Sequence, residues 1–429
     1  MTARNRDPRW RLVTVLGFST VLSLSGDLTL YAILPVNAGG LLLTLGQIGI
    51  LLSANRFVRL ISNPLTGFLL DRGRRRPIYL SGLLLGTLST LMYALTRQFW
   101  VLLIGRLLWG LAWSLINVGG NTMIVDSTQP SDRGRYLGIL TLMLSLGLAL
   151  NPLIGGFLAD AAGFQPTMLI CALLTGAGFF LSLLLLPETH PRTADTRPLE
   201  ASLDAPSEPN FRLEHWSSSL KNFQLPSLQR EIWLAILLTF VTFFAGNGLI
   251  MATVGRFLTI EFGQSIAFGE ALIGMTALTG IVLGARALLI ALAAPLSGAF
   301  SDRRKSRWPV VLFSLALGTL GMFALGGLPP LPALLVGITL VSLCEGALLT
   351  VLPAIVGDGA PEALRGRAMG LTFMAGDLGA ALAPLLVYSL LALIPLRTVY
   401  LATGGAFSLC LVLMMIGISG FKISDINHK

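Results

Sequence analysis

The sequence predicts an all-α membrane protein in which twelve transmembrane helices form two pseudo-symmetric six-helix bundles. Three observations support this prediction. The chain has 429 residues, of which 54% are hydrophobic and only 12% charged, and its mean hydropathy is +0.77. Long apolar segments recur along its whole length. Short motifs of the first half return about 231 residues later in the second.

The low charge content indicates that lipid, rather than water, is the main solvent. Soluble domains carry roughly 25% charged residues, about twice the fraction in this chain. A helix needs about 20 apolar residues to cross a bilayer, and spans of this length are helices because a helix satisfies its own backbone hydrogen bonds in lipid. Twelve such spans are predicted: 12–35, 43–70, 77–96, 99–124, 136–159, 164–187, 232–255, 271–300, 308–328, 331–357, 368–395 and 398–420.

The repeated motifs lie at connections and bends between the spans. One set recurs at an offset of 231 residues: Pro64, Gly67, Asp71 and Arg72 return as Pro295, Gly298, Asp302 and Arg303. Two sets recur at 232: Asp126, Arg133, Gly134, Arg135 and Gly138 return as Asp358, Arg365, Gly366, Arg367 and Gly370, and Gly147 and Pro152 as Gly379 and Pro384. Six spans separate the copies, so both halves face the same way. Parallel repeats of this kind are typical of secondary transporters, whose site lies between the halves.

A polar segment divides the chain. We expect residues 1-187 to form the first bundle, residues 188-230 a Pro- and Ser-rich cytoplasmic linker, and residues 231-429 the second bundle. Most lysines and arginines fall on the connections that share a face with both termini, and this bias places the termini in the cytoplasm. It also accounts for the net charge of +9, so we expect no nucleic-acid partner.

Two loops and one helix carry the repeated glycines and charges. GFLLDRGRRRP (67–77), between the second and third spans, contains Gly67, Asp71, Arg72, Arg75 and Arg76, and GAFSDRRKSR (298–307) contains Gly298, Asp302 and Arg303. We expect Gly67 to allow close helix approach, Asp71 to meet the positive end of a neighbouring helix, and the arginines to hold the loop in the cytoplasm. In the fifth span, we expect Gly147, Gly155 and Gly156 to remove side chains along one helix face and Pro152 to bend the helix, which suits a seal between the halves.

These motifs resemble those of the major facilitator superfamily. The first loop resembles its signature GxxxDRxGRR, although the second glycine comes one position early, and LIGRLLWG in the fourth span resembles its arginine-containing motif. GLALNPLIGG (147–156) resembles the fifth-helix motif GxxxGPxxGG of its antiporter members, with Asn151 in place of a glycine. GDLTLYAILP, which contains Asp27 and Tyr31, is similar to the acidic first-helix motif of its multidrug exporters. The resemblance implies the major facilitator fold, with spans one, four, seven and ten around a central cavity.

Seven ionisable residues lie inside the predicted spans: Asp27, Arg56, Arg59, Arg106, Arg286, Glu345 and Asp377. A charge near the bilayer centre costs roughly 2.5–3.5 kcal/mol, so each needs a partner or a wet cavity. Asp27 and Arg106 fall at one depth, and Arg286 and Glu345 at another, which predicts two buried pairs. For Asp377 we expect gating or packing between the halves. The arginines at 56 and 59 either bind an anion or tether that interface.

The cavity wall is predicted from helical spacing and from the resemblance. Arg106, Trp109, Trp113 and Asn117 follow one stripe of the fourth span, as Asp27 and Tyr31 do on the first. The resemblance places Asp27, Tyr31, Arg106, Trp109, Trp113, Phe243, Asn247 and Glu345 around the cavity. The two tryptophans are candidate contacts for flat apolar or cationic groups of a substrate.

The expected function is proton-coupled export of small amphipathic compounds or metabolites by alternating access, with the proton as coupling ion and no other cofactor. Asp27 is the main candidate for the coupling carboxylate and Glu345 the second. For each, the alternative is a static ion pair with its arginine. A symporter or facilitator for polar or anionic solutes stays open, as does a non-transporting sensor or assembly partner.

Several other classes are disfavoured. The sequence contains no GxxxxGK[ST] phosphate loop, and its three histidines lie outside the spans, so we expect neither an ATP-driven pump nor an enzyme nor a metal site. We expect a monomer that works in a lipid bilayer on a small-molecule substrate. The bacterial inner membrane, with both termini in the cytoplasm, is the expected location.

Overall fold

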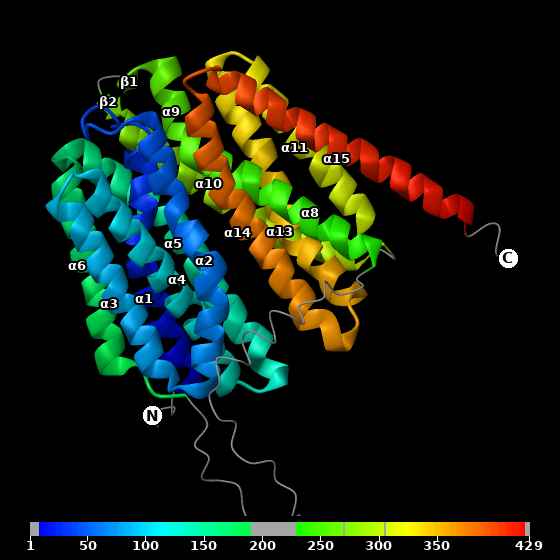
Figure 1. Cartoon of the computed structure of the whole chain (residues 1–429), viewed down its shortest axis with the longest axis horizontal. Helices are drawn as coiled ribbons and strands as arrows, with labels where there is room; N and C mark the ends of the chain where they lie inside the picture. Colours follow the sequence, from blue (N-terminus) through cyan, green and yellow to red (C-terminus); the bar gives the residue numbers. More distant parts are fainter. Residues whose placement is uncertain (1–7, 190–228, 269–270, 304–305, 425–429) are drawn as a thin grey trace, which may run out of the picture.

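The computed structural model of this protein describes residues 8–189, 229–268, 271–303 and 306–424. Most of this part of the chain is helical, and long helices run side by side (Figure 1). The first half contains α1 (Pro8–Ile33), α2 (Leu45–Arg72), α3 (Arg75–Leu95), α4 (Phe99–Ser127), α5 (Pro130–Ala162) and α6 (Phe164–Leu185). The second half contains α8 (Arg230–Phe243), η2 (Phe244–Ile250), α9 (Met251–Phe262), β1 (Ser265–Phe268), β2 (Ala271–Gly274), α10 (Met275–Asp302), α11 (Trp308–Gly327), α12 (Pro330–Pro332), η3 (Ala333–Gly337), α13 (Ile338–Gly359), η4 (Glu362–Leu364), α14 (Arg365–Leu390) and α15 (Leu396–Ser424).

The helices account for the predicted spans. Within the described residues, eleven helical segments are long and apolar enough to cross a membrane. The remaining predicted span, 43–70, corresponds to α2, which has 28 residues but carries several polar and charged side chains. Two of the eleven are composite, because α8, η2 and α9 form one continuous helix and so do α12, η3 and α13. The all-α membrane fold is confirmed.

A short hairpin corrects the start of the eighth span. We expected that span to begin at residue 271, but β2 occupies Ala271–Gly274 and pairs antiparallel with β1. Helix α10 begins only at Met275, after Gly274 in an extended conformation. The error has a simple cause, since a short apolar run cannot by itself distinguish a strand from a first helical turn.

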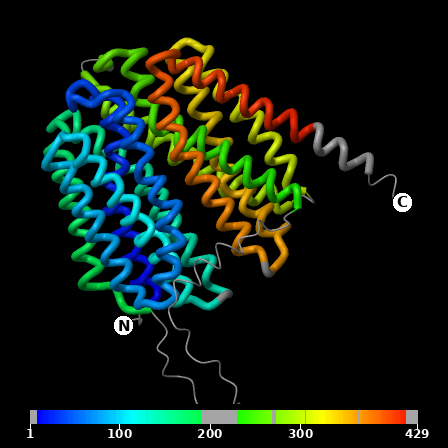
Figure 2. The backbone as a smooth tube through the Cα atoms, viewed as in Figure 1, coloured from blue at the N-terminus to red at the C-terminus, as the bar shows by residue number. Residues whose placement is uncertain are grey.

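The helices gather into two groups that follow the chain (Figure 2). In the first group α1 packs against α5 and α6, and α3 packs against α4 and α6; in the second, α11 packs against α13 and α15. Between the groups, α5 lies against α10 and α2 lies against α14. The predicted linker, 188–230, falls almost wholly outside the described residues, so its course stays a prediction.

The contact of α5 with α10 and that of α2 with α14 repeat one another. A Cβ atom added to Gly280 on α10 would collide with the carbonyl oxygen of Pro152 on α5. A Cβ atom added to Gly49 on α2 would lie 2.8 Å from the carbonyl oxygen of Pro384 on α14. These glycines are 231 positions apart and the prolines 232, so the internal repeat of the sequence is also a repeat of backbone contacts. Such close approach requires the absence of side chains.

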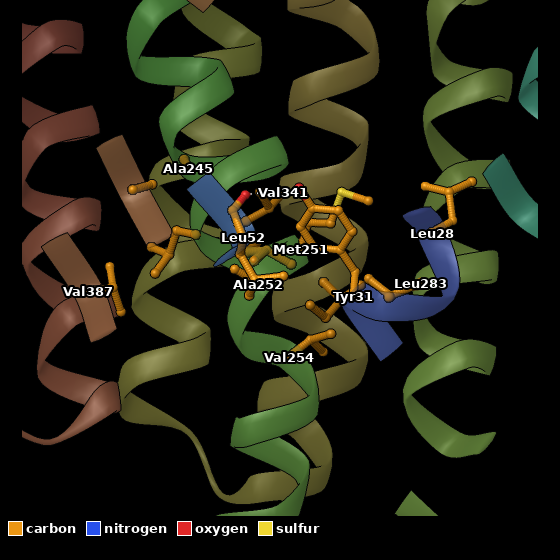
Figure 3. Close-up of a cluster of buried hydrophobic side chains, with 14 of the residues drawn as sticks. Leu28, Tyr31, Leu52, Ala245, Met251, Ala252, Val254, Leu283, Val341 and Val387 are labelled. Carbon is orange, nitrogen blue, oxygen red and sulfur yellow. Dashed lines mark hydrogen bonds between the residues drawn. The ribbon is translucent and has the colours of Figure 1, made fainter. Parts of the chain in front are cut away.

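The halves meet at the end of the bundle away from the N-terminus, here called the far end. There, a cluster of buried apolar side chains draws on both halves, including Tyr31 and Leu52 from the first and Met251 and Leu283 from the second (Figure 3). Asn37 Nδ2 donates to the Thr276 hydroxyl across the same interface, at 3.4 Å. The far end is therefore closed by packed side chains in this conformation.

The opposite end, where α1 begins, is called the near end. Here each half has an ion pair that fastens one of the repeated loops to a helix terminus. Arg75 Nε lies 2.9 Å from Asp126 Oδ2, and Arg307 Nε lies 2.9 Å from Asp358 Oδ2. Both residues of the second pair are 232 positions after their counterparts in the first. The halves thus share local structure as well as helix order.

Candidate functional site

A buried ion pair occupies the middle of the first half. Arg106 on α4 donates from Nη1 to Oδ1 of Asp27 on α1, from Nε to the Leu51 carbonyl at 2.8 Å, and from Nη2 to the Tyr31 hydroxyl at 3.3 Å. Asn55 Nδ2 also donates to Asp27 Oδ1, at 3.3 Å. Arg106 is fully buried, whereas 10% of the Asp27 side chain is exposed. The predicted pairing of these two charges is present.

The Asp27 carboxylate is unevenly satisfied. Both donors, from Arg106 and Asn55, reach Oδ1, and no described residue donates to Oδ2. A carboxylate oxygen with free lone pairs and some exposure is an atom at which a proton can bind. Asp27 therefore combines a fixed counter-charge with one open oxygen.

A second buried pair occupies the second half. Arg286 Nη2 on α10 donates to Glu345 Oε2 on α13, and Asn247 Nδ2 donates to Glu345 Oε1, both at 2.5 Å. Only 1% of the Glu345 side chain is exposed. Both of its oxygens thus have donors, in contrast to Asp27. The predicted pair is present, and Asn247 serves here as a partner of Glu345.

A π-helical segment makes room for this carboxylate. Asn247 lies within η2, which interrupts the helix between α8 and α9. A Cβ atom at Gly246 would collide with the carboxylate of Glu345. Segments of π-helix are rare in proteins, but those that occur often lie at functional sites, because the extra residue redirects neighbouring side chains. Nothing in the predicted span 232–255 identified this interruption, although its glycine and asparagine are the residues that the site uses.

A third ionic contact joins the two halves. Arg59 Nη2 on α2 lies 2.9 Å from Asp377 Oδ1 on α14, and Asn63 Nδ2 donates to Asp377 Oδ2 at 3.3 Å. Arg56 Nη1 is farther from the same carboxylate, at 3.8 Å. Of the two roles expected for Arg59, tethering is the one present in this conformation. Asp377 lies at the interface between the halves, as expected.

Arg56 connects the ionic contacts electrostatically. It lies within electrostatic range of Asp27 and Asp377, and Glu345 lies within electrostatic range of Arg56. Its Nε is buried and has no hydrogen-bond partner among the described residues. The seven ionisable residues comprise four arginines and three carboxylates, and Arg56 is the arginine with the weakest ion pair of the four. The charges of the two halves thus belong to one network.

Of the two tryptophans predicted to line the cavity, one is corrected by the structure. Trp109 is 1% exposed and packs against Gly86 of α3, so in this conformation it is a core residue. At about 100° per residue, Trp109 lies about 60° from Arg106, at the edge of the predicted stripe. Trp113 is partly exposed, and the Arg59 guanidinium lies 6.0 Å from its ring centroid. Tyr31 is also buried, within the far-end cluster.

Two of the residues predicted to line the central cavity border smaller cavities on the side of the near end. Asn117 lines a cavity of about 170 Å³ between α1, α4 and α5. Phe243 lines a much smaller one, of about 30 Å³, between α8, α13 and α14, and it also packs over Gly376. Both side chains are partly exposed.

The first loop motif is only partly as expected. Nothing lies within 4 Å of a Cβ atom added to Gly67, so this glycine does not serve close helix approach in this conformation. Asp71 is exposed and pairs with no described residue. The arginines are engaged instead: Arg72 stacks over Phe68 at 4.1 Å, and Arg76 Nη2 donates to the Leu183 carbonyl at 2.6 Å. Helix pairing at this end therefore does not depend on the glycine.

In the second loop, Asp302 accepts from Arg307 at 2.9 Å, and a Cβ atom at Gly298 would lie 3.2 Å from Thr350. Arg303 follows the last residue of α10. Arg307 also pairs with Asp358, and so it occupies the position that Arg75 holds in the first half. The repeated set of Pro295, Gly298, Asp302 and Arg303 in the sequence does not include this arginine.

The fifth-helix motif serves two different neighbours. Cβ atoms at Gly155 and Gly147 would meet Thr29 and Val21 of α1, whereas one at Gly156 would lie 2.5 Å from the Thr276 carbonyl of α10. We had expected all three glycines on one face. Because successive residues are about 100° apart on a helix, Gly155 and Gly156 face different partners. Helix α5 thus contacts both its own half and the other.

Comparison with known proteins agrees with this architecture. The sequence model of the Major Facilitator Superfamily matches residues 16–285 and 274–425. The tetracycline resistance protein, class C, of Escherichia coli is 31% identical over 153 residues, which are 36% of this chain and 38% of that protein. The quinolone resistance protein NorA of Staphylococcus aureus (strain Mu50 / ATCC 700699) is 29% identical over 36% of this chain and 40% of its own length. These alignments therefore span well under half of the curated relatives.

Solved structures share the fold over nearly the whole chain. A bacterial homolog of the human lysosomal transporter Spinster, in an inward-facing and unoccupied conformation, has a TM-score of 0.70 at 15% identity, with 96% of both chains covered. The peptide transporter POT, in complex with sulfate, has a TM-score of 0.74 at 17% identity and covers 95% of this chain and 94% of its own. The chain is a multi-pass membrane protein that belongs to the Major Facilitator Superfamily, a family of transporters for small molecules rather than of enzymes.

Proposed function

We propose that this protein is a proton-coupled exporter of small amphipathic compounds that works by alternating access. The observation that carries the proposal is the Asp27 carboxylate, paired with buried Arg106 through one oxygen and open at the other. The names of the relatives, which concern resistance to tetracycline and to quinolones, support export as the direction. The proton is the proposed coupling ion, with no other cofactor.

The proposed mechanism follows from charge. A proton that binds Oδ2 of Asp27 neutralises the carboxylate and removes its attraction for Arg106. Arg106 also donates to Tyr31, which belongs to the far-end cluster. A change in the charge of Asp27 therefore acts on a residue of the closed end. In this scheme a proton from outside favours one access state, and substrate that binds from inside favours release of that proton.

Asp27 is preferred to Glu345 as the main proton site. Glu345 is almost wholly buried and has a donor on each oxygen, so a proton would have to share an oxygen with the hydrogen bond from Asn247 or Arg286. Asp27 can accept a proton at Oδ2 without the loss of a hydrogen bond. Glu345 is therefore proposed as a charge partner that stabilises the second half, and as a secondary proton site only when its contacts open.

One observation favours a second candidate function. Arg56 has a long ion pair and an unsatisfied Nε, so an anionic substrate could complete its charge balance. This supports the symporter or facilitator for anionic solutes. Arg106, in contrast, is fully buried, and each of its three nitrogens already donates a hydrogen bond, which argues against its use as a direct anion ligand. A sensor or assembly role has no specific observation in its favour.

We further propose that both termini lie in the cytoplasm of a bacterial inner membrane, which makes the near end cytoplasmic, and that the monomer is functional. Growth of a pump-deficient bacterial host that expresses the protein, challenged with tetracycline and norfloxacin, tests export. Higher resistance than that of a host with an empty vector supports the proposal. Anion accumulation in proteoliposomes, with no gain of resistance, would instead favour the second candidate.

A further inference from the structure

The cavity beside Asn117 differs from its repeat counterpart in chemistry. It is lined by Gly17 and Thr20 of α1, by Ile116, Asn117, Gly120 and Asn121 of α4, and by Leu140, Thr141 and Leu144 of α5. None of these nine lining residues is ionisable. Hydroxyl and amide groups supply its polarity.

The polar groups of this cavity are only partly used by the protein. Asn121 Nδ2 donates to the Asn117 carbonyl at 2.7 Å and to Asn117 Oδ1 at 3.3 Å, and Thr141 Oγ1 donates to the Leu137 carbonyl at 2.9 Å. No described residue accepts from Asn117 Nδ2 or donates to Asn121 Oδ1. One amide donor and one amide acceptor therefore remain for a ligand.

The counterpart in the second half is apolar. At an offset of 232, Asn117, Asn121 and Thr141 correspond to Leu349, Pro353 and Phe373, all of which line the cavity of about 30 Å³. That cavity also has three threonines, Thr239, Thr242 and Thr372, but each donates its hydroxyl to the carbonyl four residues earlier in its own helix. The repeat thus presents a polar surface in one half and an apolar one in the other.

We propose that the cavity at Asn117 is a substrate subsite for an uncharged group rich in hydrogen bonds, such as a hydroxyl or an amide. The inference rests on the proposed export function and deepens it by naming the substrate class. A charged group would be desolvated there without a counter-charge, at a large cost in free energy. A cavity of about 150 Å³ holds one aromatic ring, whereas whole ligand sites span roughly 300–1,000 Å³. This subsite therefore takes one end of a molecule.

The substrates it selects are neutral at their polar end and apolar at the other. The polar end binds Asn117 and Asn121, and the apolar end faces the second half, where Leu349, Pro353 and Phe373 offer no hydrogen bonds beyond those of the backbone. The buried charges lie elsewhere, since neither Asp27 nor Arg106 lines the cavity. Selection and coupling are thus performed by different residues of the first half.

Calorimetric titration of the purified full-length protein in detergent tests this. The probes are chloramphenicol, an uncharged amphipath with hydroxyl and amide groups; tetraphenylphosphonium, an apolar cation; and salicylate, an anion. We expect chloramphenicol to bind and Asn117→Leu to weaken its binding about tenfold, the effect of one or two lost hydrogen bonds. Thr122→Val is the matched control, because that hydroxyl on the same helix donates to the Val118 carbonyl and lies outside the cavity.

Asn117→Asp keeps the shape of the side chain and guards against misfolding as an explanation. It is expected to shift preference from chloramphenicol toward tetraphenylphosphonium. Undetectable binding of chloramphenicol, equal binding to the Asn117→Leu variant, or salicylate binding that depends on Asn117 would overturn the inference. These outcomes are independent of proton coupling. Intact Asn117-dependent binding without proton-driven transport in proteoliposomes would count against the proposed function alone.

Discussion

The Arg59 guanidinium lies 2.9 Å from the Asp377 carboxylate, and this ion pair joins α2 of the first half to α14 of the second. Both side chains are mostly buried, with 16% and 7% exposed. The loss of one partner of such a pair leaves an uncompensated charge, at a cost of about 3–5 kcal/mol. The pair therefore favours the conformation in which the far end is closed.

Asp377→Asn should shift the protein toward states with an open far end. The measurement is the rate at which a membrane-impermeant maleimide labels a cysteine placed at Val36, a buried far-end residue, after the three native cysteines are replaced. We expect faster labelling in Asp377→Asn. The exchanged variant, Arg59→Asp with Asp377→Arg, restores an ion pair and should return the rate toward that of the parent. Equal rates in all three proteins would show that the pair does not control closure.

Gly156→Val should have the same effect for a steric reason. Its Cβ atom would lie 2.5 Å from the Thr276 carbonyl, and a backbone oxygen cannot rotate away as a flexible side chain does. The closed far end should become unfavourable, so labelling at Val36→Cys rises and transport falls. Gly405→Val is the control, because nothing lies within 4 Å of a Cβ atom at that position. Slow labelling in Gly156→Val would mean that α5 and α10 separate without opening the far end.

Substitutions at Trp109 and Trp113 should have different effects, the first mainly on stability and the second mainly on substrate binding. Trp109 is buried against α3, so Trp109→Ala should lower the free energy of unfolding by about 3–5 kcal/mol and lower the Tm in detergent. Trp100 on the same helix is 71% exposed, and Trp100→Ala should change the Tm little. Trp113→Ala should weaken substrate binding more than it lowers the Tm. An unchanged Tm for Trp109→Ala would refute its assignment to the core.

The pair of Glu345 and Arg286 should behave as a unit. Arg286→Met leaves the carboxylate buried without its cation and should lower the Tm strongly. The double variant, Arg286→Met with Glu345→Gln, removes both charges and should recover most of the loss, because two neutral side chains need no mutual compensation. Thermal unfolding in one detergent compares the parent, Arg286→Met, Glu345→Gln and the double variant. Additive losses would mean that the two side chains do not depend on each other for stability.

The sequence predicted the architecture and the buried pairs well, because both follow from local rules. Span length identifies helices in lipid, and the depth of a residue along its span can be counted, which brought together Asp27 with Arg106 and Glu345 with Arg286. The internal repeat at 231–232 residues was also visible, and it reappears in the contacts of Pro152 with Gly280 and of Pro384 with Gly49.

What the sequence did not predict depends on how helices turn about their axes and pack. Trp109 lies at the edge of the cavity stripe, yet tertiary packing places it in the core. Asn55 and Asn63 complete the ion pairs of Asp27 and Asp377, but asparagines in a polar helix gave no separate signal. The π-helix at Gly246 depends on neighbouring helices that a single segment does not reveal.

Proton release from inside-out membrane vesicles tests the central proposal most directly. Vesicles that contain the parent protein are acidified by respiration, a pH-sensitive dye is followed, and chloramphenicol or tetracycline is added. The account predicts that substrate triggers proton release with the parent protein, and that Asp27→Asn abolishes this release while it retains substrate binding. Proton release from Asp27→Asn as strong as that from the parent would contradict the assignment of Asp27 as the coupling carboxylate.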